Sequence, residues 1–173
     1  TVSRKRGKSN MRIDSIKIRN FRCFPEIEEG SWGVQFRPNA HLNLIVGPNG
    51  VGKTTILDAL DLVLNAENRS NQSLITEYDF PNCDTIKPLY IEVTLIDLGE
   101  ARGEFASDIQ WIDPADGILV EEKEMLPDNN CHREAVIVAL EAFLDDRSGA
   151  IEWRWLLPKF PATSIESAKE LSR

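Results

Sequence analysis

The residues best suited to chemistry lie together in one stretch, Gly47-Pro48-Asn49-Gly50-Val51-Gly52-Lys53-Thr54. This stretch fits the pattern G-x-x-x-x-G-K-[ST] at every position. Glycine permits backbone angles that a Cβ would forbid, so the peptide N–H groups can approach an anion closely. With the positive end of a helix that begins near Lys53, those groups would form a preorganised anion site. The spacing therefore predicts a loop that holds the phosphates of a nucleotide.

Three side chains at the end of this stretch have expected roles at the phosphates. Lys53 would place a positive charge at the β and γ phosphates, which makes it the candidate catalytic residue. The hydroxyl of Thr54 is the expected magnesium ligand, because Mg²⁺ prefers hard oxygen ligands and keeps several waters. Thr55 is expected to form a hydrogen bond with the α-phosphate. The predicted cofactors are therefore a nucleoside triphosphate and Mg²⁺.

The sequence around the loop predicts the elements that would position it. Residues 41–47 form a short apolar run ending in glycine, which is typical of a buried strand before a tight turn. From Lys53 onward the apolar spacing becomes that of a helix, with one face made of Ile56, Leu57, Leu60, Val63 and Leu64. A chance match to the motif is disfavoured, because strand, glycine loop and helix follow one another as the motif requires.

The rest of the chain predicts mainly strands separated by turn residues. The expected strands are residues 11–19, a second strand after the turn at Gly30 and Gly33, residues 89–98 and residues 118–125. Residues 99–105 are expected to open a short helix. No internal repeat is present.

A hairpin is predicted near the end of the chain. Its strands are residues 134–146 and 150–157, and the second strand alternates strictly, with Ile151, Trp153 and Trp155 on one side. Beyond it, Thr163 or Ser164 would cap a closing helix.

Length and charge place the chain among single-domain globular proteins. It has 173 residues and a mass of 19.5 kDa, which suffices to bury a core. The net charge of −8 argues against a dedicated nucleic-acid-binding face. Yet eight of the 20 Lys and Arg residues lie in residues 1–22. Residues 1–10 are interpreted as a disordered basic leader or a remnant of cloning, with Met11 as the natural start. The alternative is a basic arm that contacts nucleic acid.

The cysteines indicate a reducing compartment, which favours the cytoplasm. Cys23, Cys83 and Cys131 are odd in number and have no metal-type spacing, so free thiols are expected. The neighbouring pair Cys131-His132 has no second pair, which argues against a zinc site. No segment approaches the 18 or so apolar residues of a membrane helix.

Two stretches together resemble a known group of ATPases. "GPNGVGKTT" resembles the ABC-ATPase form of the loop, in which the residue at the position of Asn49 lies near the γ-phosphate. Combined with "MRIDSIKIRNFRCF", it resembles the SMC, RecF and OLD (overcoming lysogenisation defect) group of DNA-associated ATPases. The resemblance implies an α/β P-loop NTPase fold with an antiparallel β portion. It also implies that Arg22 reaches the phosphates of the nucleotide; the alternative is a solvated arginine at a strand end.

Within that group, "LITEYDFPNCDTIKPLYIEVTLIDL" resembles the OLD-family ATP-dependent endonucleases. The resemblance covers residues 11–98 well and residues 99–173 loosely. It implies that residues 11–173 are the N-terminal part of an ABC-type ATPase domain, cut before its second half. It also implies ATP as the nucleotide, DNA as a partner of the parent protein, and a homodimer or higher homo-oligomer at full length. No guanine-reading N-K-x-D motif occurs.

The parts that complete an ABC-type site have no convincing match. A signature loop, an apolar run ending in adjacent acids and a switch histidine are all missing from the pattern. Asp97 and the pair Asp145-Asp146 are weak candidates for the acids, and the hairpin explains the pair better. Gln110 is interpreted as an exposed loop glutamine rather than a magnesium sensor. We therefore expect the chain to bind nucleotide and to hydrolyse it slowly or not at all.

Three further clusters have competing interpretations. The tryptophans Trp153 and Trp155 beside Arg154 could stack bases, but a place in the core is favoured. Asp79 and Asp84 would line a nucleotide lid or cap a loop. A solvated acidic stretch, rather than a metal site, is expected at Glu121, Glu122 and Glu124.

Three functions remain to be compared. The first is the nucleotide-binding lobe of an OLD-type nuclease. The second is an ATP-gated dimerisation module of RecF or SMC type without nuclease activity, although heptads are lacking after residue 66. The third, a small-molecule kinase, is disfavoured by the two strands ahead of the loop and by the tryptophan-rich hairpin.

Overall fold

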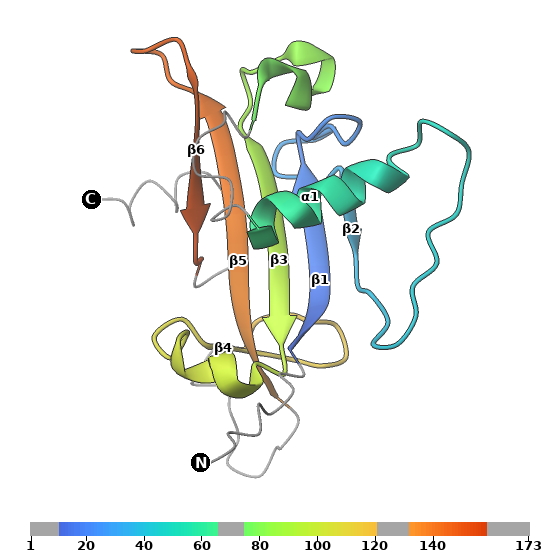
Figure 1. The fold of residues 1–173 in the computed structure, drawn as a ribbon, viewed down its shortest axis with the longest axis vertical. Helices are drawn as coiled ribbons and strands as arrows, with labels where there is room; N and C mark the ends of the chain where they lie inside the picture. Colours follow the sequence, from blue (N-terminus) through green and yellow to red (C-terminus); the bar gives the residue numbers. More distant parts are fainter. Residues whose placement is uncertain (1–10, 66–74, 121–131, 159–173) are drawn as a thin grey trace, which may run out of the picture.

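In the computed structural model, residues 11–65, 75–120 and 132–158 are described. They form one antiparallel sheet with helix α1 (Lys53–Asn65) lying across one of its faces (Figure 1). The main strand order is β2-β1-β3-β5-β4, and β6 pairs with β5 beside β4. The strands are β1 (Arg12–Arg19), β2 (Val34–Phe36), β3 (Leu89–Ile96), β4 (Gln110–Ile112), β5 (Arg133–Leu144) and β6 (Ile151–Leu156). Three short 3-10 helices join them: η2 (Glu77–Asp79), η3 (Pro81–Cys83) and η4 (Gly99–Gly103).

The core lies between the sheet and α1. Strand β3 is central, and each of its eight residues is buried. Because side chains alternate between the two faces of a strand, the odd-numbered residues of β3 face α1 and the even-numbered ones face away. The α1 side is apolar and includes Ile16, Ile18, Ile91, Val93 and Leu140.

The face of the sheet turned away from α1 carries buried charged groups in pairs. Glu92 is fully buried and accepts a hydrogen bond from Lys17 at 2.9 Å. Glu141 accepts one from Arg154 Nε at 2.7 Å. The guanidinium of Arg19 lies 4.9 Å from the ring centre of Tyr90. Pairing offsets the cost of removing these charges from water, so this face can be both polar and buried.

The helix buries a different stripe from the expected one. Its buried residues are Thr55, Ile56, Ala59, Leu62 and Val63, whereas Leu57 and Leu64 are exposed. Ala59 is fully buried at the middle of this stripe, so the contact face runs along the 55-59-62 line. The prediction of a helix from Lys53 is confirmed, and the prediction of its face is wrong at Leu57 and Leu64.

The expected buried strand at residues 41–47 is not formed. This segment has no strand assignment, and Leu42, Leu44 and Val46 are 80%, 82% and 76% exposed. It belongs to a long connection that leaves the sheet after β2 and returns at α1 (Figure 1). Among the described residues, no strand pairs with it, so its apolar side chains have nothing to be buried against.

The remaining expected elements are largely confirmed. Residues 11–19 form β1, 89–98 contain β3 and 99–105 contain η4, and the hairpin is β5 and β6. In the segment 118–125, Leu119 bridges to Ile112, and the part beyond residue 120 lies outside the described residues. So do residues 1–10, Cys131, the acidic stretch 121–124 and the start of the closing helix. The part of the chain that is described contains no helix long and apolar enough to cross a membrane.

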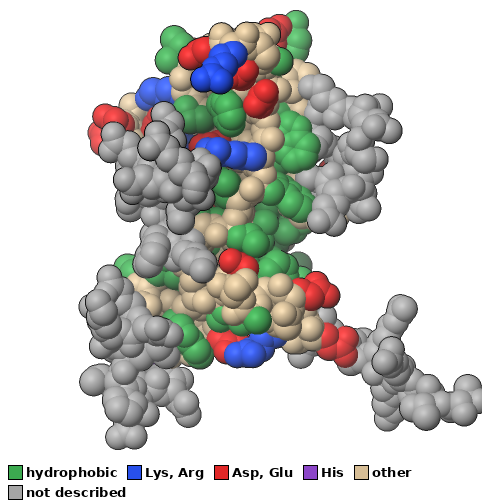
Figure 2. Space-filling model, turned by 90° about the vertical axis from the view of Figure 1, so that its left-hand side faces the viewer, with side chains coloured by type: hydrophobic (Ala, Val, Ile, Leu, Met, Phe, Trp, Pro, Cys, Tyr) green, Lys and Arg blue, Asp and Glu red, His purple; other side chains and the backbone are tan. Residues whose placement is uncertain are grey.

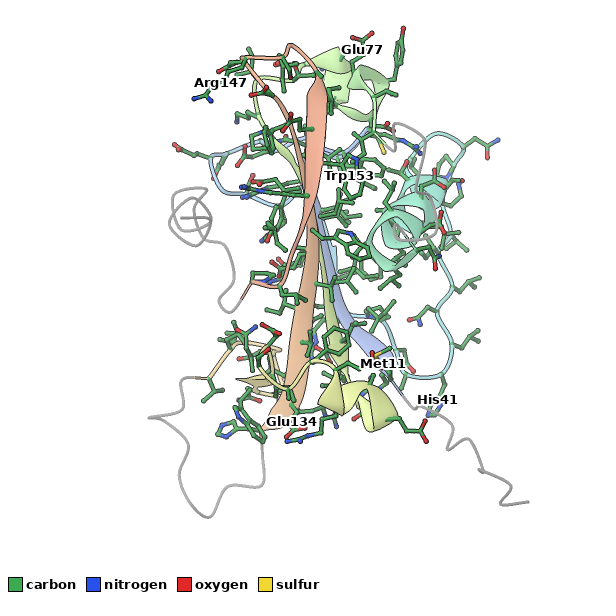
Figure 3. The ribbon with its side chains drawn as sticks, turned by 60° about the vertical axis from the view of Figure 1, so that its left-hand side comes forward. Met11, His41, Glu77, Glu134, Arg147 and Trp153 are labelled. Carbon is green, nitrogen blue, oxygen red and sulfur yellow. The ribbon has the colours of Figure 1, made fainter. Side chains whose placement is uncertain are left out.

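The two tryptophans of β6 are not buried core residues. Trp153 pairs with Ala142 and Trp155 with Leu140, so both lie on the α1 side of the sheet. Figure 3 views the sheet nearly edge-on, with α1 and Trp153 on the same side. Their exposed fractions are 39% and 36%, because β6 is an edge strand beyond the main contact of α1. Figure 2 looks onto this edge and shows hydrophobic side chains at the surface among charged ones.

Candidate nucleotide-binding site

The glycines of the loop adopt conformations that few other residues tolerate. Gly50 has a φ of 83° and Gly52 a φ of 95°. A Cβ on Gly52 would lie 2.5 Å from Phe24 Cζ and 2.6 Å from Cys23 Sγ. A Cβ on Gly50 would meet nothing within 4 Å. Gly52 is therefore fixed by both its backbone angle and its packing, while Gly50 is required by its angle alone.

Lys53 begins α1 and folds back over the loop. Its Nζ donates a hydrogen bond to the carbonyl oxygen of Gly47 at 2.8 Å and another to that of Pro48. An ammonium has three donors, so one remains after these two contacts. The carbonyls hold the positive charge above the loop, at the end of the helix where an anion is favoured.

The two threonines that follow differ in exposure. Thr54 is exposed, whereas Thr55 is buried and its Oγ1 lies 3.7 Å from Cys23 Sγ. The first helical hydrogen bond runs from Ile56 N to Gly52 O, at 3.1 Å. The hydroxyl of Thr54 is thus the accessible oxygen at the start of α1. It fits the hydroxyl ligand that a P-loop supplies to Mg²⁺, which also takes phosphate oxygens and waters.

Arg22 is bound by two carboxylates from different elements. Its Nε donates to Asp79 Oδ1 at 2.9 Å, and its Nη1 donates to Asp58 Oδ2. Its backbone N–H donates to the carbonyl of Asp79 at 2.7 Å. Burial alone would lower the pKa of the Arg22 guanidinium, but the hydrogen bonds and charges of Asp79 and Asp58 outweigh burial and raise it. The side chain is therefore a firmly held cation.

The segment that supplies Asp79 is shaped by local capping. Asp79 Oδ2 accepts a hydrogen bond from Thr76 N at 3.0 Å, and Asp84 Oδ1 accepts one from Ile86 N at 3.0 Å. Phe80 is buried and anchors the segment in the core. Both aspartates thus cap a loop, and Asp79 additionally fixes Arg22.

Several other candidates lie away from the loop. Gln110 is in β4, opposite Ala135, at the end of the sheet remote from Arg22. It is half-buried and donates to Pro158 O at 2.7 Å, so the expectation of an exposed loop glutamine is wrong. Figure 3 shows the two ends of the sheet, with Glu77 of η2 at one and Glu134 beside β4 at the other. Residues near β4 are therefore not part of the loop site.

The weak acidic candidates are explained by local structure. Asp97, which follows β3, binds Arg12 at 2.8 Å at the β4 end of the sheet. Asp145 sits in the turn of the hairpin and accepts a hydrogen bond from Ser148 N at 2.9 Å. This hydrogen-bonding to Ser148, through its side chain and its backbone, lowers the pKa of Asp145. Within the described ranges no group of three or more His, Cys, Asp or Glu side chains could hold a metal.

Sequence reasoning gave no role at the loop to three residues, Cys23, Phe24 and Asp58, and did not foresee that Asp79 binds Arg22. Cys23 and Phe24 pack against Gly52, while Asp58 and Asp79 bind Arg22. Asp58 follows Thr54 by four residues and so lies on the same side of α1. This helical spacing could have placed Asp58 near the loop from the sequence alone. Nothing in the sequence indicated the contact with Asp79, because it depends on how the segment 75–84 folds.

Comparison with known proteins gives the family. A profile described as the AAA ATPase domain matches residues 11–142, well over half of the chain. The chain belongs to the AAA ATPase domain family. Its fold is that of an α/β P-loop ATPase, present as an N-terminal lobe with an antiparallel sheet, as the sequence predicted.

Relatives of this AAA ATPase domain include proteins of two of the groups named from the sequence, OLD and RecF, together with a Rad50 ATPase. An OLD nuclease of Thermus scotoductus is 42% identical over 81 residues, which are 47% of this chain and 14% of that protein. The DNA replication and repair protein RecF of Prosthecochloris aestuarii is 50% identical over 50 residues, 29% of this chain and 12% of RecF. The DNA double-strand break repair ATPase Rad50 of Methanopyrus kandleri is 42% identical over 52 residues, 30% of this chain and 5% of Rad50.

The matched parts are small fractions of the relatives, so the AAA ATPase domain corresponds to a minor share of their length.

Among solved structures, an SMC ATPase described for ATP-driven dimerisation and DNA-stimulated activation is similar over 83% of this chain and 68% of that chain. It has 16% sequence identity and a TM-score of 0.39. The resemblance to OLD nucleases and RecF is confirmed by sequence.

Proposed function

We propose that this chain is the Mg-ATP-binding lobe of an OLD-type ATP-dependent DNA endonuclease. The observation that carries the proposal is the loop 47–54, which starts α1 with Lys53 folded over it. The positive φ angles of Gly50 and Gly52 turn the loop as an anion-binding loop requires. The OLD nuclease match supports the nuclease assignment, because it extends over 81 residues.

Within this proposal each loop residue has a role. The backbone N–H groups of residues 47–52, including those of Asn49 and Val51, bind phosphate oxygens, and Lys53 exchanges a carbonyl contact for the β and γ phosphates. The exposed hydroxyl of Thr54 ligates magnesium, and Thr55 reaches the α-phosphate. Magnesium, when bound, neutralises charge on the β and γ phosphates. The chain itself binds and orients the nucleotide.

We further propose that the chain is incomplete for hydrolysis. The apolar run at residues 42–46 is exposed, and so are Leu57 and Leu64 on the outer side of α1. Exposed apolar surface on two adjacent segments favours a second layer of structure that covers them. Neither of the two acids considered from the sequence, Asp97 and Asp145, lies at the loop, since each is engaged elsewhere. Without either of them there, the water that would attack the γ-phosphate lacks the acid expected to position it.

The wider setting follows from the same proposal. Residues 11–173 would be the N-terminal part of an ABC-type ATPase domain, and residues 1–10 a basic leader. DNA would be contacted by the parent protein, which would act as a homodimer or higher homo-oligomer in the cytoplasm. The exposed thiols of Cys23 and Cys83 are compatible with a reducing compartment.

A second candidate is an ATP-gated dimerisation module of the RecF or SMC type. The observation in its favour is the higher local identity to RecF, 50% over 50 residues. The two candidates differ in what the full-length protein does with DNA. Magnesium-dependent cleavage of plasmid DNA by the full-length protein would favour the OLD type. ATP-dependent dimerisation without cleavage would favour the second.

The test of nucleotide binding is calorimetry with Mg-ATP on the wild-type chain and on Lys53→Ala. We expect the variant to lose about ten- to a hundredfold in affinity, because a charge-assisted hydrogen bond to phosphate is removed. Lys87→Ala is the matched control, since the half-exposed Lys87 pairs with Glu26 rather than with the loop. Equal affinity of wild type and Lys53→Ala would contradict a phosphate site at the loop.

A further inference from the structure

Arg22 lies where three parts of the molecule meet. It follows β1, and its guanidinium bridges Asp58 of α1 and Asp79 of η2. Its φ of 51° is in the left-handed region, which a non-glycine residue enters at some cost. The backbone hydrogen bond to Asp79 O helps to hold that conformation. The direction of the side chain is therefore set by its partners.

This bridge adjoins the proposed phosphate site. The next two residues, Cys23 and Phe24, pack against Gly52, and Cys23 also contacts Thr55. Asp58 lies one helical turn beyond Thr54 on the same side of α1. The guanidinium of Arg22 is thus held within about one turn of the residues proposed to bind magnesium and the α-phosphate.

The charges around Arg22 are unbalanced. Two carboxylates face one guanidinium, so the cluster carries a net negative charge beside a site proposed for a polyanion. Like charges at this range repel, and the repulsion grows as water is excluded. A phosphate group, like a carboxylate, offers Arg22 a pair of oxygen acceptors for two N–H groups. The phosphates of the nucleotide and the two carboxylates can therefore both bind the guanidinium of Arg22.

We propose that Asp58 and Asp79 compete with the nucleotide's phosphates for Arg22 and thereby weaken nucleotide binding. This inference rests on the proposed function. The two aspartates are positioning residues that act through Arg22. Nucleotide binding exchanges one carboxylate contact of Arg22 for a phosphate contact.

The contact with Asp58 is the one that Arg22 exchanges for a phosphate. Its side chain is 41% exposed, whereas that of Asp79 is 14% exposed and also caps the segment through Thr76. A half-exposed ion pair contributes little net stability, so breaking it costs little. Asp79 remains with Arg22 through both its carboxylate and its backbone carbonyl. The bridge opens at the helix, on the side of the loop.

The test is calorimetry of Mg-ATP binding to wild type, Asp58→Asn and Asp61→Asn at low salt. Asp61 is the matched control, because it lies on the same helix and accepts a hydrogen bond from Asn65 at 2.7 Å. We expect Asp58→Asn to bind ATP about two- to fivefold more tightly than wild type, and Asp61→Asn to bind like wild type. In the Arg22→Ala background, the Asp58→Asn substitution should no longer tighten binding.

A second readout separates competition from a structural effect. Adenosine has no phosphates, so its affinity should be the same for Asp58→Asn and wild type. Equal or weaker ATP binding by Asp58→Asn, or tightening that persists without Arg22, would overturn the competition. Failure of both wild type and Asp58→Asn to bind ATP would instead overturn the proposed function. The experiment thus distinguishes failure of the competition from failure of the proposed nucleotide binding.

Discussion

Strand β3 and the segment 42–46 are both rich in large apolar side chains, and their surroundings differ completely. In β3 every residue is buried, with β1 and β5 on either side and α1 above. In the segment 42–46, Leu42, Leu44 and Val46 are exposed, and no described strand lies beside them. The contrast teaches that an apolar run predicts that a segment tends to be buried, but does not predict which other element will cover it. The sheet finds its partners within this chain, whereas the segment leading to the phosphate loop does not.

The largest expected effect comes from removing side-chain volume in β3. Ile91→Ala should lower the free energy of unfolding by about 2–5 kcal/mol, because Ile91 is fully buried in the central strand. Leu44→Ala, on the exposed segment, should change it by less than about 0.5 kcal/mol. Urea denaturation of both variants measures the contrast. Equal losses from the two would show that the segment 42–46 is buried in solution.

The two loop glycines allow a sharper comparison inside the site. Gly50→Ala and Gly52→Ala both place a Cβ on a left-handed residue, which costs about 1–2 kcal/mol. Only Gly52→Ala also brings that Cβ within 2.6 Å of Phe24 and Cys23, so it should destabilise the protein further. The difference in melting temperature between the two variants is the measurement. If Gly50→Ala proved the more harmful, the packing of Cys23 and Phe24 on the loop would be refuted.

The smallest expected effect concerns Tyr90 on the polar face. Burial is the largest cause that raises the pKa of Tyr90 above its ordinary value of 10.0. The negative charges of Glu92 and Glu141 raise the pKa further, and the positive charge of Arg19 opposes them. The folded protein therefore keeps this proton where the unfolded chain releases it. The contribution of Tyr90 to the free energy of unfolding is fully present below pH 10 and is lost as the pH rises further.

Tyr90→Phe should remove this alkaline loss. The Tyr90 hydroxyl is buried and has no hydrogen-bond partner among the described residues, so the variant should also be up to about 1 kcal/mol more stable at neutral pH. Unfolding free energies at neutral pH and at about pH 11 measure both effects. Tyr78→Phe is the matched control, because Tyr78 is exposed. An unchanged alkaline slope in Tyr90→Phe would assign the loss to other groups.

Local pattern was enough to predict most elements of the sheet and the helix. The alternation in residues 11–19 and 150–157 is a property of each strand alone, and β1 and β6 follow it. The contact face of α1 was missed at Leu57 and Leu64, because it depends on where the sheet lies beneath Ala59. The loop motif was visible in the sequence, but the Arg22 bridge joins residues far apart in the chain. Such contacts leave no periodic signal.

The pairing of β1 with β3 has a consequence for how the chain folds. Arg19 pairs with Tyr90 and Arg12 with Ile96, so the whole loop and α1 lie within one long excursion between paired strands. Closing such an excursion costs chain entropy before any contact compensates it, and distant pairings slow folding. During synthesis, the phosphate loop leaves the ribosome well before β3 and β5 can close the sheet beneath its helix. Acquisition of nucleotide affinity is therefore expected to be a late event in the maturation of this chain.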